Sequence, residues 1–366
     1  MTGRDVSAFF ITAESPISDA IAAIDRSRRV SLALVVNADR RLVNTITDGD
    51  VRRGILAGLK LSDPVAQLLE IKARTPHPVP VTAPATTQPQ DALAVMNANL
   101  VRQLPLVDEN GVPKDVVILS DLLRESEKPI QAVVMAGGQG MRLRPLTENT
   151  PKPLLPVGGK PVMEFIVDQL RDVGVKHIHV ATHYQAEKIM DHFGDGAAFG
   201  VKIDYVQETQ PLGTGGALGL IQAPTETTLI INGDILTQVD FQSFHAFHVD
   251  HAAEMTVGVR RYDVQVPYGV VDCEGAKLTG LREKPQLSFF VNAGIYLVEP
   301  SVFRLIPPDR HLNITDLVQM LIDAGRTVVS YPICEYWLDI GQHEDYQRAQ
   351  VDAREGKLQR SAVEDE

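Results

Sequence analysis

The sequence has few cysteines and no long apolar run, and both absences limit where the protein is expected to work. Cys273 and Cys334 are the two cysteines of the 366 residues, with neither CxxC spacing nor a metal-ligand cluster around them. We expect reduced, unpaired thiols of a cytoplasmic protein. The amino-terminal stretch lacks an apolar core behind a basic start, and no apolar run has the length of a membrane span. The sequence therefore predicts neither secretion nor a membrane partner.

The chain also has no excess of basic over acidic residues. The chain carries 35 Lys and Arg against 47 Asp and Glu, a formal net charge of −12. Nucleic acids and anionic membranes both attract basic surfaces, so neither is expected as a partner. Small anionic substrates remain compatible, because a few local cations can bind phosphate inside an acidic protein. With 44% hydrophobic and 22% charged residues, the composition is ordinary for a globular chain with room for two or three domains.

The most informative stretch begins with a short apolar run at residues 132–136, the pattern of a buried parallel strand. Three glycines follow it: Gly137, Gly138 and Gly140. Because glycine has no Cβ, a polyanion can approach this backbone closely and accept hydrogen bonds from successive N–H groups. Arg142 and Lys152 add two cations, and prolines restrict the backbone between them. The pattern predicts a phosphate-binding loop.

Two common phosphate-binding motifs are absent from this loop. No Gly-Lys-Ser/Thr follows the glycines, and Leu143 breaks the G-x-G-x-x-G pattern. What remains is G-G-x-G-x-R-L-x-P-L-T followed by P-K-P-L-L-P-V. This ordered pattern resembles the signature of the sugar-1-phosphate nucleotidyltransferases, also called nucleotide-sugar pyrophosphorylases. No hexapeptide repeat follows, which argues against the carboxy-terminal β-helix that some relatives carry.

Strand-like and helix-like segments alternate from residue 132 to about residue 251, and short strands dominate after Met255. Such alternation predicts an α/β fold with a mostly parallel sheet and helices on both faces. The resemblance implies a Rossmann-like, glycosyltransferase-A-like nucleotidyltransferase domain with a mixed, mostly parallel sheet over residues 128–366. Ligands of such sheets bind at the carboxyl ends of strands near a topological switch point, where we expect the glycine loop.

Residues 1–127 contain a weak internal repeat, with copies at about 8–65 and 72–127. Each copy reads helix, strand, turn, strand, helix when Asp19 is aligned with Asp91 and Leu34 with Leu106. One copy is too small to bury both faces of its sheet, so the two copies are expected to pair. The repeat resembles a tandem pair of cystathionine-β-synthase-type (CBS) domains, an α+β module.

Relatives with this module hydrogen-bond the ribose of an adenosine nucleotide through a Thr/Ser-x-x-Asp group. Thr47 and Asp50 fit that group in the first copy, whereas Ile118 replaces the hydroxyl before Asp121 in the second. The alternative is a module used only for dimerisation, with Asp50 and Asp121 as helix N-caps. The resemblance implies a homo-oligomer, dimeric or tetrameric, whose activity an adenosine or guanosine nucleotide bound in this module would regulate.

The reaction of the nucleotidyltransferases joins a sugar-1-phosphate to a nucleoside triphosphate, so the site must hold several negative charges together. By resemblance, Arg142 neutralises the departing phosphates and Lys152 reaches the phosphates from the opposite side. Mg²⁺ is the implied cofactor, held by Asp234 of the NGDIL segment and Asp339 of W-x-D-x-G. Each aspartate alone would more often be a cap or turn residue, but the two sequence frames together favour metal ligands.

The resemblance also assigns nucleotide and sugar residues. Gln207 would read the base, Gly213 would let its loop close over the nucleotide, and Lys284 would bind the phosphate of the sugar-1-phosphate. The implied nucleotide-binding set is Ala136, Gly137, Gly138, Gly140, Met141, Arg142, Lys152, Gln207, Gly213 and Thr214. The implied sugar-phosphate set is Gly269, Glu283, Lys284 and Asn292. The implied catalytic set is Arg142, Lys152, Asp234, Lys284 and Asp339.

The motifs most resemble those of bacterial guanylyltransferases that act on mannose-, glucosamine- or heptose-1-phosphate. Transfer of GMP from GTP to a sugar-1-phosphate is therefore the expected activity. Uridylyl and thymidylyl relatives share nearly all of these motifs, so a uridylyl- or thymidylyltransferase acting on glucose-1-phosphate is the alternative. An inactive regulatory or sensor relative is an alternative of another class, but retention of the whole catalytic set favours an enzyme.

Overall fold

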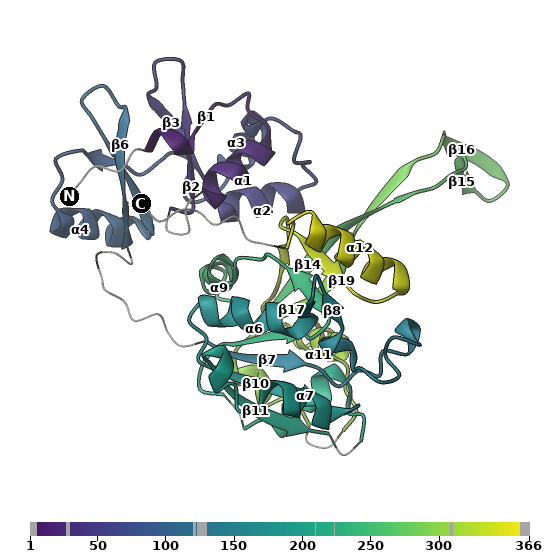
Figure 1. Ribbon diagram of the computed structural model, residues 1–366. Helices are drawn as coiled ribbons and strands as arrows, with labels where there is room; N and C mark the ends of the chain where they lie inside the picture. The colour runs from purple at the N-terminus through teal and green to yellow at the C-terminus, as the bar shows by residue number, and fades with distance from the viewer. Residues whose placement is uncertain are drawn as a thin grey trace. The chain divides into compact units, whose positions relative to one another are not determined.

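The computed structural model describes residues 6–26, 30–119, 122, 130–208, 210–222, 224–307 and 310–358. The chain divides into two compact units, one over residues 1–128 and one over residues 129–360 (Figure 1). Within the described ranges, none of the helices combines the length and the apolar character that a membrane span requires.

The first unit contains two three-stranded sheets of the same topology. Their orders are β1-β2-β3 and β4-β5-β6, and in each the first pair of strands is parallel and the second antiparallel. Phe10 lies opposite Leu34 in one sheet and Ala83 lies opposite Leu106 in the other, so Leu34 and Leu106 are equivalent, as the repeat alignment predicts. The strands are β1 (Phe10–Ile11), β2 (Leu32–Val36), β3 (Leu42–Thr47), β4 (Ala83–Pro84), β5 (Gln103–Val107) and β6 (Pro113–Ile118).

The two copies share a hydrophobic core. Val116 and Ile118 of the second copy belong to the same buried cluster as Leu32 and Leu34 of the first. Each sheet therefore covers apolar surface of the other, which one copy alone could not bury. The helices of this unit are α1 (Ile17–Asp25), α2 (Asp48–Leu56), α3 (Val65–Lys72) and α4 (Pro89–Asn99).

The second unit is a three-layer α/β structure built on a seven-stranded sheet of order β11-β10-β7-β12-β17-β14-β18. β17 is antiparallel to both of its neighbours, and the other strands are parallel to one another, which confirms the mixed, mostly parallel sheet. The strands are β7 (Gln131–Met135), β10 (His177–Thr182), β11 (Lys202–Gln207), β12 (Thr228–Asn232), β14 (Met255–Gln265), β17 (Gln286–Val298) and β18 (Val328–Pro332).

Helices cover both faces of this sheet (Figure 1). Apolar residues at helical spacing in α6, such as Met163, Ile166 and Leu170, are buried against one face together with residues of α7 and α9. Leu317 and Leu321 of α11 pack on the other face with α10. These helices are α6 (Val162–Asp172), α7 (Ala186–Phe193), α9 (Phe241–Asp250), α10 (Pro300–Phe303) and α11 (Ile314–Asp323), and α12 (His343–Arg354) follows.

Two-stranded pairings complete the unit. β8 (Pro156–Val157) pairs with β9 (Lys160–Pro161), and β13 (Ile235–Thr237) pairs with β19 (Trp337–Asp339). β15 (Val270–Glu274) and β16 (Lys277–Arg282) form a hairpin at the end of the β14–β17 ribbon. We call residues 259–291 the arm, because they project away from the seven-stranded sheet (Figure 1).

Candidate active site

The switch point of the sheet lies between β7 and β12. From β7 the parallel strands β10 and β11 extend to one side, and β12 begins the other side. The glycine loop follows the carboxyl end of β7, and Asp234 follows the carboxyl end of β12. Gly233 N donates a hydrogen bond to Met135 O over 2.8 Å, which fixes the two loops next to each other. The candidate site is therefore at the ligand-binding edge of an open α/β sheet.

The glycine loop is held by backbone bonds at its ends and is open in its middle. Ala136 N donates to Ala181 O over 2.8 Å, and Gly140 O accepts from the buried Thr147 hydroxyl over 2.8 Å. Gly140 has φ of +61°, and a Cβ there would lie 2.9 Å from Thr147 Cγ2. Among the described residues, apart from the chain neighbours of Gly138, no heavy atom lies within 4 Å of its Cβ position, so this backbone is accessible to a ligand. The exposed Met141 starts a 3-10 turn, η2 (Met141–Leu143).

Strands β13 and β19 bring the two predicted metal ligands together. Ile235 lies opposite Asp339 in this antiparallel pair, and Ile340 N donates to Asp234 O over 3.1 Å. Two aspartates that are far apart in the sequence are thus adjacent because of a short ladder that no local pattern indicates.

Lys152 lies between these carboxylates. It begins a 3-10 turn, η3 (Lys152–Leu154), and its ammonium group donates to Asp234 Oδ2 and lies 3.6 Å from Asp339 Oδ1. The Lys152 side chain is 11% exposed. The guanidinium NH2 of Arg142 lies 3.9 Å from the Cβ position of Gly341, next to Asp339. Two of the three predicted cations therefore lie at the aspartate pair.

The aspartate pair fits a divalent cation. Asp234 Oδ1 and Asp339 Oδ1 are buried and have no hydrogen-bond partner among the described residues. Burial, with the charge of Asp234 as the second cause, raises the pKa of Asp339 above its ordinary value. Adjacent carboxylate oxygens without protein donors are the hard ligands that Mg²⁺ prefers, and the charge of a bound cation would oppose both causes of this shift.

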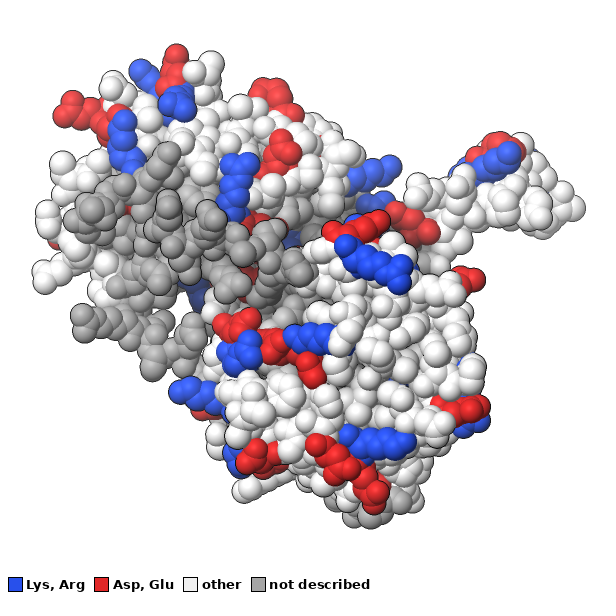
Figure 2. All heavy atoms as spheres, viewed as in Figure 1, with Lys and Arg blue, Asp and Glu red and all other residues white. Residues whose placement is uncertain are grey.

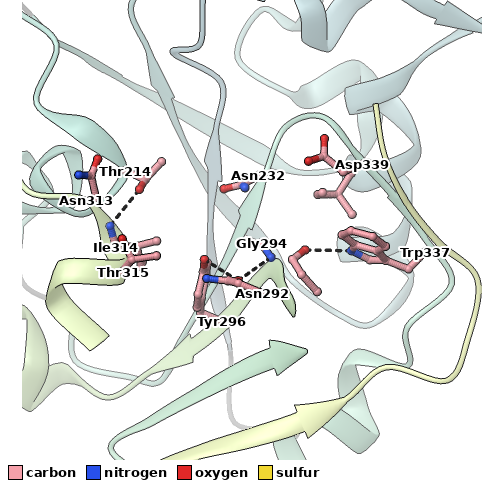
Figure 3. A pocket seen from close by; sticks show the side chains of 12 residues that line it. Thr214, Asn232, Asn292, Gly294, Tyr296, Asn313, Ile314, Thr315, Trp337 and Asp339 are labelled. Carbon is pink, nitrogen blue, oxygen red and sulfur yellow. Dashed lines mark hydrogen bonds between the residues drawn. The ribbon is translucent and has the colours of Figure 1, made fainter. Parts of the chain in front are cut away.

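A pocket of about 300 Å³ opens beside Asp339 (Figure 3). Asn292 Oδ1 accepts hydrogen bonds from Gly294 N and from the Tyr296 hydroxyl, each over 2.9 Å, so the Asn292 amide group can donate to a ligand. Burial raises the pKa of Tyr296 to about 12, which keeps this hydroxyl protonated. Trp337 Nε1 donates to Ala293 O over 2.9 Å. The lining residues are Thr214, Asn232, Ile235, Asn292, Ala293, Gly294, Tyr296, Asn313, Ile314, Thr315, Trp337 and Asp339.

Two residues of the pocket lining, Tyr296 and Trp337, are not among the site residues predicted from the sequence. Trp337 is the single tryptophan of the chain and occupies the first position of the W-x-D-x-G frame, which was an available signal. Tyr296 carried no signal of its own, because its role depends on lying next to Asn292 on β17.

The predicted base-reading segment lies at the end of β11. Gln207 is exposed and pairs with Thr182 in the β10–β11 ladder. Glu208, which the sequence reasoning did not select, accepts from Leu212 N over 2.8 Å, and its Oε1 lies 3.0 Å from the Cβ position of Gly137. This carboxylate therefore contacts the start of the glycine loop.

The structure gives a packing reason for a glycine at position 213, which differs from its predicted role in letting the loop close over the nucleotide. Its φ is +75°, and a Cβ there would lie 2.7 Å from Leu312 O. It begins the short helix α8 (Gly213–Gly216), whose Gly215 and Gly216 N–H groups both donate to Leu312 O over 2.8 Å. Thr214 Oγ1 accepts from Ile314 N over 3.0 Å at the wall of the pocket. The glycines thus allow close packing on the 312–314 backbone.

Three of the predicted sugar-phosphate residues lie on the arm. Gly269, Glu283 and Lys284 are exposed near its outer part, whereas Asn292 lies at its base. Lys284 precedes β17, which begins at Gln286, and the strand from Gln286 to Asn292 spans about 20 Å. The structure brings Arg142, Lys152, Asp234, Asp339 and Asn292 together but does not bring Glu283 and Lys284 to them.

In the first unit, Thr47 and Asp50 form a capping box at the start of α2. Thr47 Oγ1 accepts from Asp50 N over 3.2 Å, and Asp50 Oδ2 accepts from Thr47 N over 3.0 Å. The alternative interpretation of Asp50 as the helix N-cap is therefore wrong in its detail: Thr47 is the N-cap and Asp50 is its partner three residues later. Asp50 is 3% exposed and also accepts from Lys72 Nζ over 2.9 Å. Asp121 lies outside the described residues.

Another group of possible metal ligands lies away from the candidate site. The ligand atoms of His177, His179 and Asp204 are within 4.8 Å of one another. Lys202 and His177 already bond to Asp204, over 2.8 and 2.6 Å. His177 begins β10, at the end of the sheet opposite to the glycine loop.

The surface charge is mixed. On the face of the described residues shown in Figure 2, basic and acidic side chains are interspersed and no continuous basic patch is visible.

Comparison with known proteins matches residues 131–356 to the Nucleotidyl transferase family and residues 4–57 and 70–128 to the CBS domain family. The mannose-1-phosphate guanylyltransferase of Mycobacterium tuberculosis is 33% identical over 62% of this chain and 65% of its own. The UTP–glucose-1-phosphate uridylyltransferase of Synechocystis is 33% identical over 60% and 62%, respectively. The chain spans slightly less than two thirds of the length of these relatives.

One solved structure has a similar fold at comparable identity. A Bacillus anthracis protein assigned as a glucose-1-phosphate thymidylyltransferase, crystallised with a sucrose, superposes with a TM-score of 0.51 and 29% identity. The match covers 62% of this chain and 95% of that chain.

Proposed function

Because the chain belongs to the nucleotidyl transferase family, we propose that it transfers GMP from GTP to a sugar-1-phosphate and releases pyrophosphate. The observation that carries the proposal is the adjacency of Asp234 and Asp339 at the switch point, with Lys152 between them and a pocket of about 300 Å³ beside them. Likeness to a mannose-1-phosphate guanylyltransferase supports mannose-1-phosphate as the first acceptor to test.

Asp234 and Asp339 are proposed to hold Mg²⁺ through their buried oxygens. The bound ion would supply charge neutralisation at the α-phosphate and the departing pyrophosphate. Lys152 and Arg142 add positive charge at the same place, and the forked guanidinium of Arg142 suits the terminal phosphate oxygens. The open backbone at Gly138 is proposed to receive the triphosphate.

In this reaction a phosphate oxygen of the sugar-1-phosphate forms a bond to the α-phosphorus while the bond to the bridging oxygen of pyrophosphate breaks. The attacking oxygen is already ionised, so the site needs orientation and positive charge more than it needs a base. The Asn292 amide is proposed to donate to a sugar hydroxyl, with the Tyr296 hydroxyl holding its orientation. Trp337 is proposed to form the apolar wall for the sugar ring.

Residues 1–127 are proposed as a CBS pair that binds an adenosine or guanosine nucleotide and contributes contacts to a homo-oligomer, with the catalytic domain over residues 128–366. Regulation requires that the nucleotide bind the active and inactive arrangements with different affinity. Asp50 already accepts several hydrogen bonds, so a ribose bound there would have to replace the bonds from Thr47. Calorimetry with ATP, ADP, AMP and GTP on the full chain tests for this nucleotide.

A pyrophosphate-release assay tests the activity. Each of four nucleoside triphosphates is combined with mannose-, glucosamine-, heptose- and glucose-1-phosphate in the presence of Mg²⁺, and GTP is expected to support the highest rate. Activity restricted to UTP or dTTP with glucose-1-phosphate would replace the guanylyl assignment. No release with any pair would favour the inactive regulatory relative.

A further inference from the structure

The arm has no covering partner among the described residues of the second unit. β14 pairs with β18 only as far as Val259, and beyond that point it pairs with β17 alone. The arm ladder runs without a register shift from Val259 opposite Asn292 to Gln265 opposite Gln286. No residue from 262 to 290, all of which the structure describes, is buried. A two-stranded ribbon of this kind is marginally stable in water on its own.

Side-chain bonds stiffen the ribbon where it leaves the sheet. Arg260 NH1 donates to Ile333 O and Glu335 O over 2.8 and 2.9 Å, which anchors the base of the arm. On one face, Ser288 Oγ donates to Asp263 Oδ1 over 2.5 Å and accepts from Arg261 NH2 over 3.0 Å, which links the two strands. The ladder and these bonds favour the extended form of the ribbon, which projects away from the seven-stranded sheet (Figure 1).

The opposite face of the ribbon is apolar. Tyr262 lies opposite Phe289, and Val264 lies opposite Leu287, so these four side chains share a face. An antiparallel sheet with one polar and one apolar face normally buries the apolar one. The large exposed apolar residues of the arm are Tyr262, Val264, Tyr268, Val271, Leu278, Leu281, Phe289 and Phe290.

The exposed apolar area is enough for a stable interface. Seven of these side chains, without Phe290 on the polar face, are between 38% and 74% exposed. Together they present roughly 700 Å², taking ~150–200 Å² for a fully exposed large side chain. Stable protein interfaces bury about 800 Å² on each partner and are enriched in aromatic residues. The arm therefore has the size and the composition of an interface.

A second copy of this chain is the partner that best fits the apolar face of the arm. It would also bring Glu283 and Lys284 to a pocket, from which they are separated within their own chain. Each copy has an aspartate pair with its pocket, and an arm that carries Glu283 and Lys284 beyond the start of β17, about 20 Å of strand from Asn292 at the pocket. In a two-fold dimer the same patch serves both copies, so one contact would complete two sites.

We propose that the arm of one copy docks on a second copy, where Glu283 and Lys284 complete the sugar-phosphate end of the other site. This inference rests on the proposed function, which assigns Lys284 to the sugar-1-phosphate. It differs from that function in one respect: the catalytic aspartates and Lys284 of a working site come from different chains.

Complementation between two impaired full-length variants, assayed at a sugar-1-phosphate concentration below the wild-type KM, tests the inference. Asp234→Asn and Lys284→Ala chains with different affinity tags are co-expressed, and the hetero-oligomer is isolated through both tags in succession. In a dimer with shared sites, the Lys284→Ala chain provides intact aspartates and the Asp234→Asn chain provides an intact arm. One of two sites is complete, so about half of the wild-type rate of pyrophosphate release is expected. Asp234→Asn co-expressed with Asp339→Asn is the matched control and stays inactive.

Each other outcome overturns the inference. An isolated but inactive hetero-oligomer would show that each chain uses its own arm, and failure to recover any hetero-oligomer would show that the copies do not associate. Full activity of the Lys284→Ala chain by itself would show that the arm does not contribute to the site. The Asp234→Asn chain would still test the proposed function separately. Inactivity of the wild-type chain with every substrate pair would refute the proposed function instead.

Two neighbouring phenylalanines provide an independent measurement. Phe289→Asp places a charge on the apolar face and is expected to lower the rate at least about tenfold, as loss of a central interface residue does. Phe290→Asp, on the opposite face at a similar exposure, is expected to change the rate less than about twofold. Equal effects of the two substitutions would contradict docking through the apolar face.

Discussion

Replacement of Asp50 by alanine is expected to destabilise the first unit strongly. Asp50 is 3% exposed, and its Oδ2 lies 2.9 Å from Lys72 Nζ, which is itself 5% exposed. The same carboxylate completes the capping box with Thr47 and accepts from Arg53 over 2.6 Å. Removing it leaves the Lys72 ammonium group buried without a counter-charge.

The magnitude follows from these contacts. Breaking a buried ion pair by removing one partner costs about 3–5 kcal/mol, and loss of a helix cap costs about 1 kcal/mol. Lys72 keeps its hydrogen bond to Thr45 O over 2.7 Å, which favours the lower end of the range. We therefore expect the free energy of unfolding of the first unit to fall by about 3 kcal/mol, a large part of the stability of a small domain.

Urea denaturation of the full chain, followed by far-ultraviolet circular dichroism, measures this change. Asp91→Ala removes an exposed aspartate at the start of α4 and is expected to change the free energy by less than about 0.5 kcal/mol. The double change Asp50→Ala with Lys72→Met is expected to recover most of the loss, because no charge is then left unpaired. An Asp50→Ala chain as stable as the Asp91→Ala control would refute this account of the capping box.

The pH dependence has a defined sign. Burial by itself raises the pKa of Asp50, but the charge of Lys72 and the hydrogen bonds from Lys72 and Thr47 together lower it below its ordinary value of 3.8. A carboxylate with a depressed pKa in the folded state stabilises the fold fully when the pH is above its ordinary pKa. This stabilisation is lost as the pH falls through the pKa of the folded state. The difference in stability between wild type and Asp50→Ala is therefore expected to shrink below about pH 4. A difference independent of pH between pH 2 and 7 would contradict the assignment.

Further predictions concern the catalytic unit. Asp234→Asn is expected to lower turnover by orders of magnitude with an unchanged circular dichroism spectrum, and near-wild-type pyrophosphate release would rule out its role as a metal ligand. Arg142→Ala is expected to raise KM for the triphosphate and Lys284→Ala to raise KM for the sugar-1-phosphate; identical kinetic changes would contradict the two roles. Gly213→Ala is expected to lower the melting temperature, because its φ is +75° and a Cβ would lie 2.7 Å from Leu312 O; an unchanged melting curve would refute this packing argument. Trp337, the single tryptophan, lines the pocket, so its fluorescence is expected to change when a sugar-1-phosphate is added; a titration without any change would argue against binding there.

The sequence by itself was sufficient to predict those features of the fold that depend only on residues close together in the chain. The apolar run before Gly137 forms β7 with Ala132, Val133 and Val134 fully buried, because a strand inside a parallel sheet needs apolar residues on both faces. The weak repeat indicated two copies with the same strand register, because the strands and helices of each copy follow from the periodicity of its own apolar residues.

Only the tertiary structure decided which of these residues meet. Asp234 and Asp339 are adjacent because β13 pairs with β19, and Asn292 is oriented by Tyr296 four positions along β17. Such contacts depend on long-range strand register and on close packing, which leave no mark in a local pattern. The same holds for the arm: its motif predicts a sugar-phosphate site, but Lys284 lies beyond a continuous β14–β17 ladder that spans about 20 Å from Asn292 to Gln286.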